Sequence, residues 1–383
     1  MKICFVCGEY PPGPHGGIGT FTQILGRALV AAGHEVRVTG VYPAGHAGAE
    51  REEDCGVQVY RMKAPVNRWG WPFARYRLYQ QVARWSRQRD VDLIEAPDWE
   101  GWTAFWGRLP CPLIVRLHGS VSYFQRELQR STRSSIFMLE RAALRRADYW
   151  CSVSHYTAER TKEVFGLRSG PHAILYNPVE IGPERPKAFR SGARVVFTGT
   201  LTPKKGIISL ARAWPAVQRA RPDAELHVLG KDGLTDDGRS MRAFLAEILA
   251  SQSNSRVHFH GHIDRATLFN MLGSARVAVF PSYAEAFALA PLEAMIQGCP
   301  TIYTRRGSGP ELIEHGVDGL LIDPDEHDEI ADAIVRVLHD DQLAARLSEA
   351  GQRKVRESFS LSTLRGENER FYQSCLETFH HQN

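Results

Sequence analysis

The sequence predicts an α/β protein made of two doubly wound domains, each a parallel β-sheet flanked by helices. A chain of 383 residues exceeds what one hydrophobic core usually supports. Short apolar runs alternate with segments of helical periodicity along its length, which is typical of parallel sheets. This alternation stops at a segment with three prolines, Tyr176 to Pro186, and then starts again. The proline-rich segment is therefore the predicted hinge between two domains of one fold class.

The first predicted domain covers residues 1–177. Its opening strand runs into a loop that contains Gly16, Gly17 and Gly19. Apolar residues at helical spacing then predict a helix that stops at Gly33. The predicted strands of this domain are residues 2–7, 35–39, 92–96, 113–117 and 149–153.

The second predicted domain covers residues 178–358 and repeats the alternation of strands and helices. Its predicted strands are residues 194–198, 225–229, 256–260 and 277–280. Residues 359–383 are again helical in pattern, and we expect this last helix to pack back onto the first domain.

Two glutamates follow the strand predicted at 277–280. Glu285 lies in the loop after the strand, and Glu293, separated from it by seven residues, lies in the next predicted helix. The carboxyl edge of a parallel sheet is where open α/β folds bind ligands. Loop amides of residues 287–289 at the helix N-terminus favour an anion such as phosphate, whereas the two carboxylates favour hydroxyl groups. Together these groups predict a site for a sugar nucleotide.

With these glutamates and several further motifs, the chain resembles the retaining family 4 glycosyltransferases over essentially its whole length. That family has the GT-B architecture, in which two Rossmann-like doubly wound domains face each other across a cleft. The other motifs that carry the resemblance are Gly16-Gly17-Ile18-Gly19, Leu117-His118-Gly119, Gly199 to Gly206, Phe259 to Ile263 and Gly298 to Thr301.

The resemblance implies an acceptor-binding first domain and a second domain that binds the nucleotide sugar. It implies three catalytic residues: His118, Lys205 and Glu285. The implied donor-binding residues are Gly16, Gly17, Gly19, Thr200, Lys204, Lys205, Gly261, His262, Ile263, Glu285, Ala286, Phe287, Ala288, Leu289 and Glu293. Among them, Glu285 would bind hydroxyls of the transferred sugar, and Glu293 would bind the ribose.

Several of these residues also have a purely structural interpretation. The glycine loop fits a tight turn as well as a phosphate cradle. Glu293 fits a carboxylate that complements a helix dipole. A histidine just past a strand end, such as His118, is often structural. Lys205 also fits a solvated surface lysine. The joint order of the motifs favours the functional interpretation.

The chain departs from the family pattern in two places. Thr200 stands where the family commonly has an arginine for the donor diphosphate, so Lys204 or another base is expected to replace that charge. Ala286 and Ala288 stand where glycines are common, which narrows the space beside the sugar. These departures leave the identity of the donor open.

Other ligand classes fit the sequence poorly. The Gly-x-Gly-x-x-Gly pattern of nicotinamide and flavin sites and the Gly-Lys-Ser/Thr ending of nucleotide triphosphatase loops are absent. A net charge of +4 is too small to indicate nucleic acid. Asp323-Pro324-Asp325 and the alternating His258, His260 and His262 resemble metal-ligand patterns, but we expect a polar loop and a polar strand edge. No cofactor or metal is expected.

Residues 61–89 contain basic and aromatic side chains and no acidic one. This composition suits a membrane surface or a phosphorylated acceptor. An amphipathic helix with a buried aromatic stripe explains the same pattern. A second basic stretch, Arg126 to Arg146, favours an anionic acceptor or surface.

We therefore expect a glycosyltransferase that moves a sugar from a UDP-sugar, with a GDP-sugar as the alternative, to an acceptor hydroxyl that is lipid-linked or phosphorylated. The alternatives are a non-catalytic subunit that binds sugar nucleotide, and another GT-B enzyme such as a sugar-nucleotide epimerase. Seven scattered cysteines and the lack of a long apolar run favour a cytoplasmic protein, with peripheral attachment to the inner face of the cytoplasmic membrane as the alternative.

Overall fold

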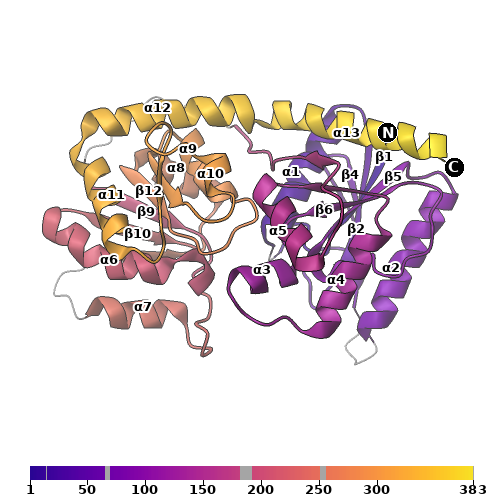
Figure 1. The fold of residues 1–383 in the computed structure, drawn as a ribbon, viewed down its shortest axis with the longest axis horizontal. Coiled ribbons are helices and arrows are strands. Elements are labelled where there is room, and N and C mark those ends of the chain that lie inside the picture. The colour runs from indigo at the N-terminus through magenta and orange to yellow at the C-terminus, as the bar shows by residue number, and fades with distance from the viewer. Residues whose placement is uncertain (14, 65–69, 182–191, 251–255, 383) are drawn as a thin grey trace. The chain divides into compact units, whose positions relative to one another are not determined.

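The computed structural model describes residues 1–13, 15–64, 70–181, 192–250 and 256–382. The chain divides into two compact units (Figure 1). One unit combines Met1–Glu180 with Ser360–Asn383, and the other covers Ile181–Phe359. The divisions therefore fall after residues 180 and 359. Part of the predicted hinge, residues 182–186, lies outside the described residues.

The first unit contains an eight-stranded sheet in the order β3-β4-β2-β1-β5-β6-β7-β8. All neighbouring strands are parallel except β3 and β4, which form an antiparallel pair at one edge. The strands are β1 Lys2–Val6, β2 Glu35–Tyr42, β3 Arg51–Asp54, β4 Val57–Lys63, β5 Leu93–Pro97, β6 Leu113–Leu117, β7 Tyr149–Ser152 and β8 Ala173–Ile174. Because β1 lies between β2 and β5, the strand order reverses at its carboxyl end, where such sheets bind ligands.

Helices of the first unit cover the two faces of this sheet (Figure 1). They are α1 Gly17–Ala31, α2 Gly70–Arg87, α3 Val121–Glu127, α4 Ser134–Arg146, α5 His155–Phe165 and α13 Leu361–Gln382. The predicted stripe of α1 is buried at Phe21, Leu25 and Leu29. Ser120 and Ser154 cap α3 and α5 by accepting hydrogen bonds from backbone N–H groups three residues later.

The second unit contains a fully parallel six-stranded sheet in the order β11-β10-β9-β12-β13-β14. The strands are β9 Arg194–Thr198, β10 Glu225–Leu229, β11 Val257–Gly261, β12 Val277–Phe280, β13 Thr301–Thr304 and β14 Leu320–Ile322. The helices are α6 Ile207–Ala220, α7 Met241–Ala250, α8 Arg265–Ser274, α9 Leu289–Ile296, α10 Gly309–Leu312, α11 His327–His339 and α12 Asp341–Ser358. Here the strand order reverses at β9, between β10 and β12.

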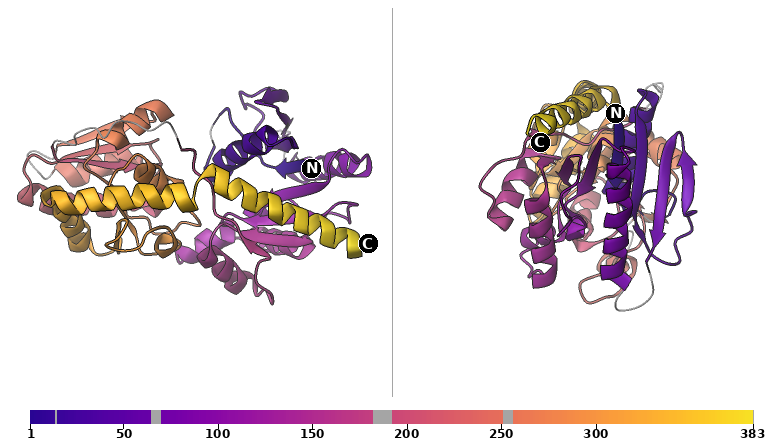
Figure 2. Two further views of the ribbon diagram at one scale, coloured as in Figure 1. Left: turned by 90° about the horizontal axis from the view of Figure 1, so that it is seen from above. Right: turned by 90° about the vertical axis from the view of Figure 1, so that its right-hand side faces the viewer.

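The last helix, α13, belongs to the first unit and lies along it (Figure 2). Buried polar contacts hold it there. The Arg116 guanidinium on β6 donates to both carboxylate oxygens of Glu95 on β5, at 2.8 and 2.9 Å. From α13, the hydroxyl of Tyr372 donates to Glu95 at 2.8 Å, and Asn368 accepts from Arg116 at 2.5 Å. All four side chains are at most 3% exposed. This network ties residues more than 250 positions apart into one unit.

Segment 61–89, which contains no acidic residue, does not form one continuous surface. Arg61 is buried at the edge of the sheet, where it pairs with Glu52 at 2.5 Å. On α2, Leu78 and Trp85 face the core, whereas Phe73 and Tyr76 are more than half exposed. Residues 65–69, which include Trp69, lie outside the described part of the chain. The buried side chains of α2 confirm the amphipathic-helix interpretation, and contact of the exposed face with a membrane or an acceptor stays a prediction.

No helix in the described part of the chain is both long enough and apolar enough to cross a membrane. The seven cysteines are free, and all except Cys55 are buried. Cys4 and Cys7 lie in and just after β1, where burial raises the pKa of both thiols and makes the thiolate, the reactive form, scarce.

We predict that Tyr372→Phe destabilises the first unit by about 1.5–3 kcal/mol, because a buried carboxylate loses a hydroxyl donor. Urea unfolding of the full chain, followed through the transition of the first unit, measures the change. Tyr76→Phe is the matched control, since Tyr76 is 56% exposed and its hydroxyl accepts a hydrogen bond from Gln80, one turn further along α2. Equal effects of the two substitutions would contradict a structural role of the buried network.

Candidate functional site

Two loops meet at the carboxyl edge of the second sheet. One follows β9 and carries Lys204 and Lys205, and the other follows β12 and carries Glu285. The backbone N–H of Tyr283 donates to the carbonyl of Lys204 at 2.8 Å. A Cβ atom at Gly206 would lie 1.7 Å from the carbonyl oxygen of Pro281, and Gly206 has φ +69°. Only glycine therefore permits this approach of the two loops.

This approach brings together two of the predicted catalytic residues. The Lys205 ammonium lies 2.5 Å from a carboxylate oxygen of Glu285. Glu285 is only 8% exposed. Burial alone would raise the pKa of Glu285, but the charges of Lys205 and Lys204 outweigh that effect and lower the pKa. Glu285 is thus a buried carboxylate that stays ionised at neutral pH.

Lys204 lies beside the same pair. Burial and the neighbouring charge of Lys205 lower the pKa of Lys204, while Glu285 acts in the opposite direction. Thr200, which stands in place of the family arginine, is exposed. Two lysines and one carboxylate therefore form a group with a net charge of +1, and an anion is the natural further partner for such a group.

The predicted residues after β11 lie on the same edge of the sheet. The N–H of Gly230 donates to the carbonyl of Gly261 at 2.8 Å, and the N–H of Gly199 donates to Leu229 at 2.9 Å. These two hydrogen bonds connect the end of β11, through the end of β10, to the loop after β9. His262 is exposed and Ile263 is partly buried just beyond it. The structure thus places Gly261, His262 and Ile263 along the edge that carries Lys205.

The helix after Glu285 begins at Leu289, with Ala288 as its N-cap. Ala286, Phe287 and Ala288 are buried, so the chain enters α9 in a fixed position. Glu293 projects from α9 and contacts the guanidinium of Arg265 on α8 at 3.4 Å. Sequence reasoning missed Arg265, although it closely follows the predicted motif at 259–263.

In the first unit, the glycine loop opens α1, with Gly16 as its N-cap. Gly16 and Gly17 are exposed. A Cβ atom at Gly19 would lie 2.1 Å from the carbonyl oxygen of Glu9, so this position needs glycine. The N–H of Gly19 donates to the carboxylate of Glu9 at 2.8 Å. Glu9, which sequence reasoning missed, thus accepts a hydrogen bond from one of the backbone amides that we predicted to bind phosphate.

His118 follows β6 in the same unit, and its ring lies 4.8 Å from that of Phe21. Burial and the charge of Arg116 lower the pKa of His118 well below its usual value, so its imidazole is neutral at pH 7. The backbone N–H of His118 donates to Oδ1 of Asp98 at 2.9 Å. Asp98 is 1% exposed, and its Oδ2 has no hydrogen-bonding partner among the described residues.

Asp98 is a positioning residue for His118 that we did not predict, although its place directly after a strand could have indicated it. Burial, together with the charge of Glu140, raises the pKa of Asp98 to about 8. Glu140 itself accepts hydrogen bonds from the N–H groups of Val121 and Ser122, which begin the helix after His118. Two buried acids therefore fix the backbone on either side of the Gly119 turn.

The carboxylates of Asp323 and Asp325 contact the Arg306 guanidinium at 2.6 and 2.5 Å. Tyr283 also donates to Asp325 at 2.9 Å. The loop with Asp323 and Asp325 is therefore held by an arginine. Because Tyr283 belongs to the segment that carries Glu285, its contact with Asp325 places this loop beside that segment.

Comparisons with known proteins match both halves of the chain. Residues 15–183 match the family model described as Glycosyltransferase Family 4, and residues 183–354 match the one described as Glycosyl transferases group 1. The chain is 25% identical, over 95% of its length and 96% of the relative's, to the GDP-mannose-dependent alpha-(1-6)-phosphatidylinositol monomannoside mannosyltransferase of Mycobacterium tuberculosis.

Among solved structures, the sucrose-phosphate synthase of Thermosynechococcus elongatus superposes with a TM-score of 0.83 at 22% identity, covering 98% of this chain and 99% of that one. The HepE protein of Anabaena, solved with UDP-glucose, gives a TM-score of 0.76 at 19% identity, covering 98% and 100%. These likenesses confirm the predicted fold class.

We predict that Asp98→Asn changes how stability depends on pH. The pKa of Asp98 is about 8 in the folded protein, against an ordinary value of 3.8 for an aspartate. Between these values the folded state holds a proton that the unfolded chain has released, so the contribution of Asp98 to stability is fully present below pH ~4 and is lost as the pH rises to ~8, by about 1.4 kcal/mol per pH unit at most. The amide introduced by the substitution does not titrate, and this part of the slope should disappear.

The measurement is urea unfolding of both proteins at several values between pH 5 and pH 9. The difference between the two curves isolates Asp98 from the other titrating groups. Parallel curves would show that Asp98 is ionised in the folded protein across this range.

Proposed function

Because the chain belongs to the family 4 glycosyltransferases, we propose that it is a retaining, metal-independent enzyme that transfers a sugar from a nucleotide-diphosphate sugar to an acceptor hydroxyl. The observation that carries this proposal is the ion pair of Lys205 and buried Glu285 at the switch point of the second sheet. A carboxylate there suits sugar hydroxyls, and the lysines beside it suit a diphosphate.

In this reaction the bond between the anomeric carbon and the diphosphate oxygen breaks. A bond from the same carbon to the acceptor oxygen forms on the same face of the sugar. The acceptor proton passes to the departing diphosphate oxygen, which becomes the stronger base as its bond breaks. The protein then has to stabilise negative charge on the leaving group and orient the two substrates.

Lys205 and Lys204 supply the positive charge for the leaving diphosphate. Glu285 keeps Lys205 in place before the donor binds, so little reorganisation is required during the reaction. Because Glu285 is ionised, it can accept hydrogen bonds from sugar hydroxyls. The family resemblance implies that neutral His118 contacts the donor sugar. It also implies that Glu293 contacts the ribose.

A UDP-sugar is the donor that we favour, with a GDP-sugar as the alternative. The HepE structure contains UDP-glucose, and the mycobacterial relative is named for GDP-mannose. The residues at the end of β11, Gly261 to Ile263, are the proposed contacts of the base. The proposed pathway class is the synthesis of cell-surface glycans, glycolipids or related glycoconjugates.

For the acceptor we propose an anionic molecule, lipid-linked or phosphorylated, that meets the exposed face of α2. Arg77, Arg84 and Arg87 line a groove of about 810 Å³ there, next to exposed Tyr76. Arg75 is not available for such a role, because its guanidinium donates to Gly101 and stacks on Trp71 at 4.0 Å.

We predict that one nucleotide among UDP, GDP and ADP raises the melting temperature of the protein, since a ligand that binds only the folded state stabilises it. Glu293→Ala should lose most of this shift because the ribose contact is gone. Glu247→Ala, an exposed glutamate on α7, is the matched control and should keep it. If no nucleotide shifts the transition at millimolar concentration, the donor proposal is wrong.

We predict that Lys205→Ala lowers kcat for sugar transfer by about 10²–10³, the typical effect of removing one group that stabilises developing charge. Lys162→Ala, which removes a surface ion pair with Glu159 on α5, should leave kcat unchanged. Product formation from the nucleotide sugar selected by the melting experiment gives the rate. Nucleotide binding without any transfer or hydrolysis would favour the non-catalytic subunit.

A further inference from the structure

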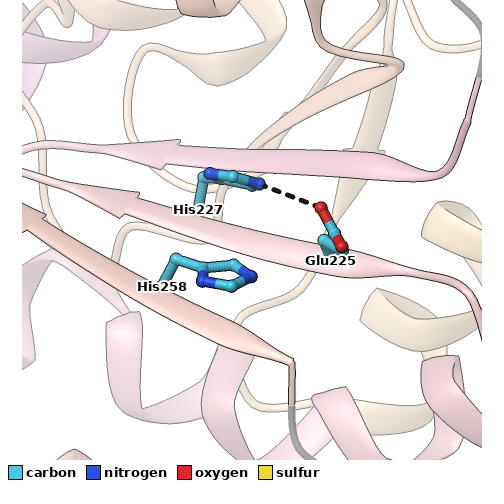
Figure 3. A group of neighbouring side chains, drawn as sticks. All are labelled: Glu225, His227 and His258. Atoms are coloured by element: carbon cyan, nitrogen blue, oxygen red, sulfur yellow. Dashed lines mark ion pairs between the residues drawn. The ribbon is translucent and has the colours of Figure 1, made fainter.

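Three histidines and a glutamate lie on one face of two adjacent strands in the second unit. Glu225 and His227 are two residues apart on β10, so both project to the same side. His227 pairs in register with His258 on β11, and their rings lie 4.8 Å apart. His260, two residues beyond His258, stacks on His227 at 5.1 Å. Figure 3 shows Glu225, His227 and His258.

The two ring nitrogens of His227 have different surroundings. Nδ1 lies 2.9 Å from Nε2 of His260, a hydrogen-bond distance. Nε2 is buried and has no hydrogen-bonding partner among the described residues. It lies 3.5 Å from a carboxylate oxygen of Glu225. If Nδ1 donates its proton to His260, the lone pair of Nε2 points toward Glu225 and is open to a metal ion.

Ligand atoms of Glu225, His227 and His258 all lie within 4.8 Å of one another. Two ligands on a tetrahedral Zn²⁺, at about 2.1 Å each from the ion, are about 3.4 Å apart, which is close to the separation of His227 and Glu225. His258 is exposed, so its ring is free to rotate toward an ion. Two imidazoles and a carboxylate are a ligand set that divalent transition metals favour.

We propose that Glu225, His227 and His258 form a binding site for one divalent transition-metal ion, with Zn²⁺ the best match. His260 is the outer partner that fixes the tautomer of His227, as carboxylates and carbonyls do in other metal sites. Such an ion joins the edge strand β11 to β10 and stabilises the folded second unit.

Two arginines near the cluster oppose a cation. Arg256 donates to the other carboxylate oxygen of Glu225 at 2.7 Å, which leaves the oxygen near His227 available. Arg194 pairs in register with Glu225 on the adjacent strand, and its guanidinium is held by a hydrogen bond to Ser274 at 2.8 Å.

The test is a titration of the chelator-stripped, tag-free full chain with ZnCl₂ by calorimetry. We expect one ion per chain. His258→Ala should weaken binding at least about 10-fold by removing a ligand, and His260→Ala should weaken it about 10–100-fold by releasing the tautomer. Both residues are exposed, so the variants should fold normally, which circular dichroism checks.

His339→Ala is the matched control, because His339 is an exposed histidine on α11 of the same unit. It should bind Zn²⁺ like the wild type. Titration with Co²⁺ adds a direct signal, since the visible absorption of the bound ion reports its ligands and should change in His258→Ala. The proposal is overturned if the wild type does not bind, or if it binds with the same affinity and Co²⁺ spectrum as His258→Ala.

Discussion

The contact on which the second unit depends is the close approach, at Gly206, of the loops that follow β9 and β12. The carbonyl of Pro281 leaves no space for a Cβ atom there, and the Tyr283 to Lys204 hydrogen bond fixes the separation of the loops. This contact sets the distance between Lys205 and Glu285. A buried carboxylate without the two lysines would protonate near neutral pH. Backbone geometry at a glycine therefore determines the charge state of an acidic residue far along the chain.

The same contact explains why the site suits an anion. Lys204, Lys205 and Glu285 carry a net charge of +1, and the pKa of Lys204 is lowered by burial and by the charge of Lys205. A diphosphate would relieve both effects, because it supplies negative charge where water is scarce. The missing family arginine at Thr200 is then less costly, since the second lysine lies within the same group of charges.

Much of this arrangement could be predicted from the sequence, because its signals are local. Apolar runs marked the central strands, and the order of strand, loop and helix placed Glu285 and Glu293 correctly. In the first unit the strands β3, β4 and β8 were missed, because β3 and β8 are short and the inward positions of β4 include the charged Arg61. Asp98 and Glu9 were missed since their importance comes from partners brought near by folding. The pairing of His227 with His258 depends on strand register, which a sequence pattern does not specify.

The proposed metal site and metal-independent sugar transfer are compatible, because they lie at different ends of the same strands. Glu225 is the first residue of β10, whereas Leu229, its last, contacts Gly199 at the carboxyl edge. Four residue steps along a strand span about 13 Å. An ion held at Glu225 would therefore contact neither Lys205 nor Glu285 directly. In the proposed reaction the lysines would provide the positive charge, and the ion would act on the stability of the edge strand that carries Gly261.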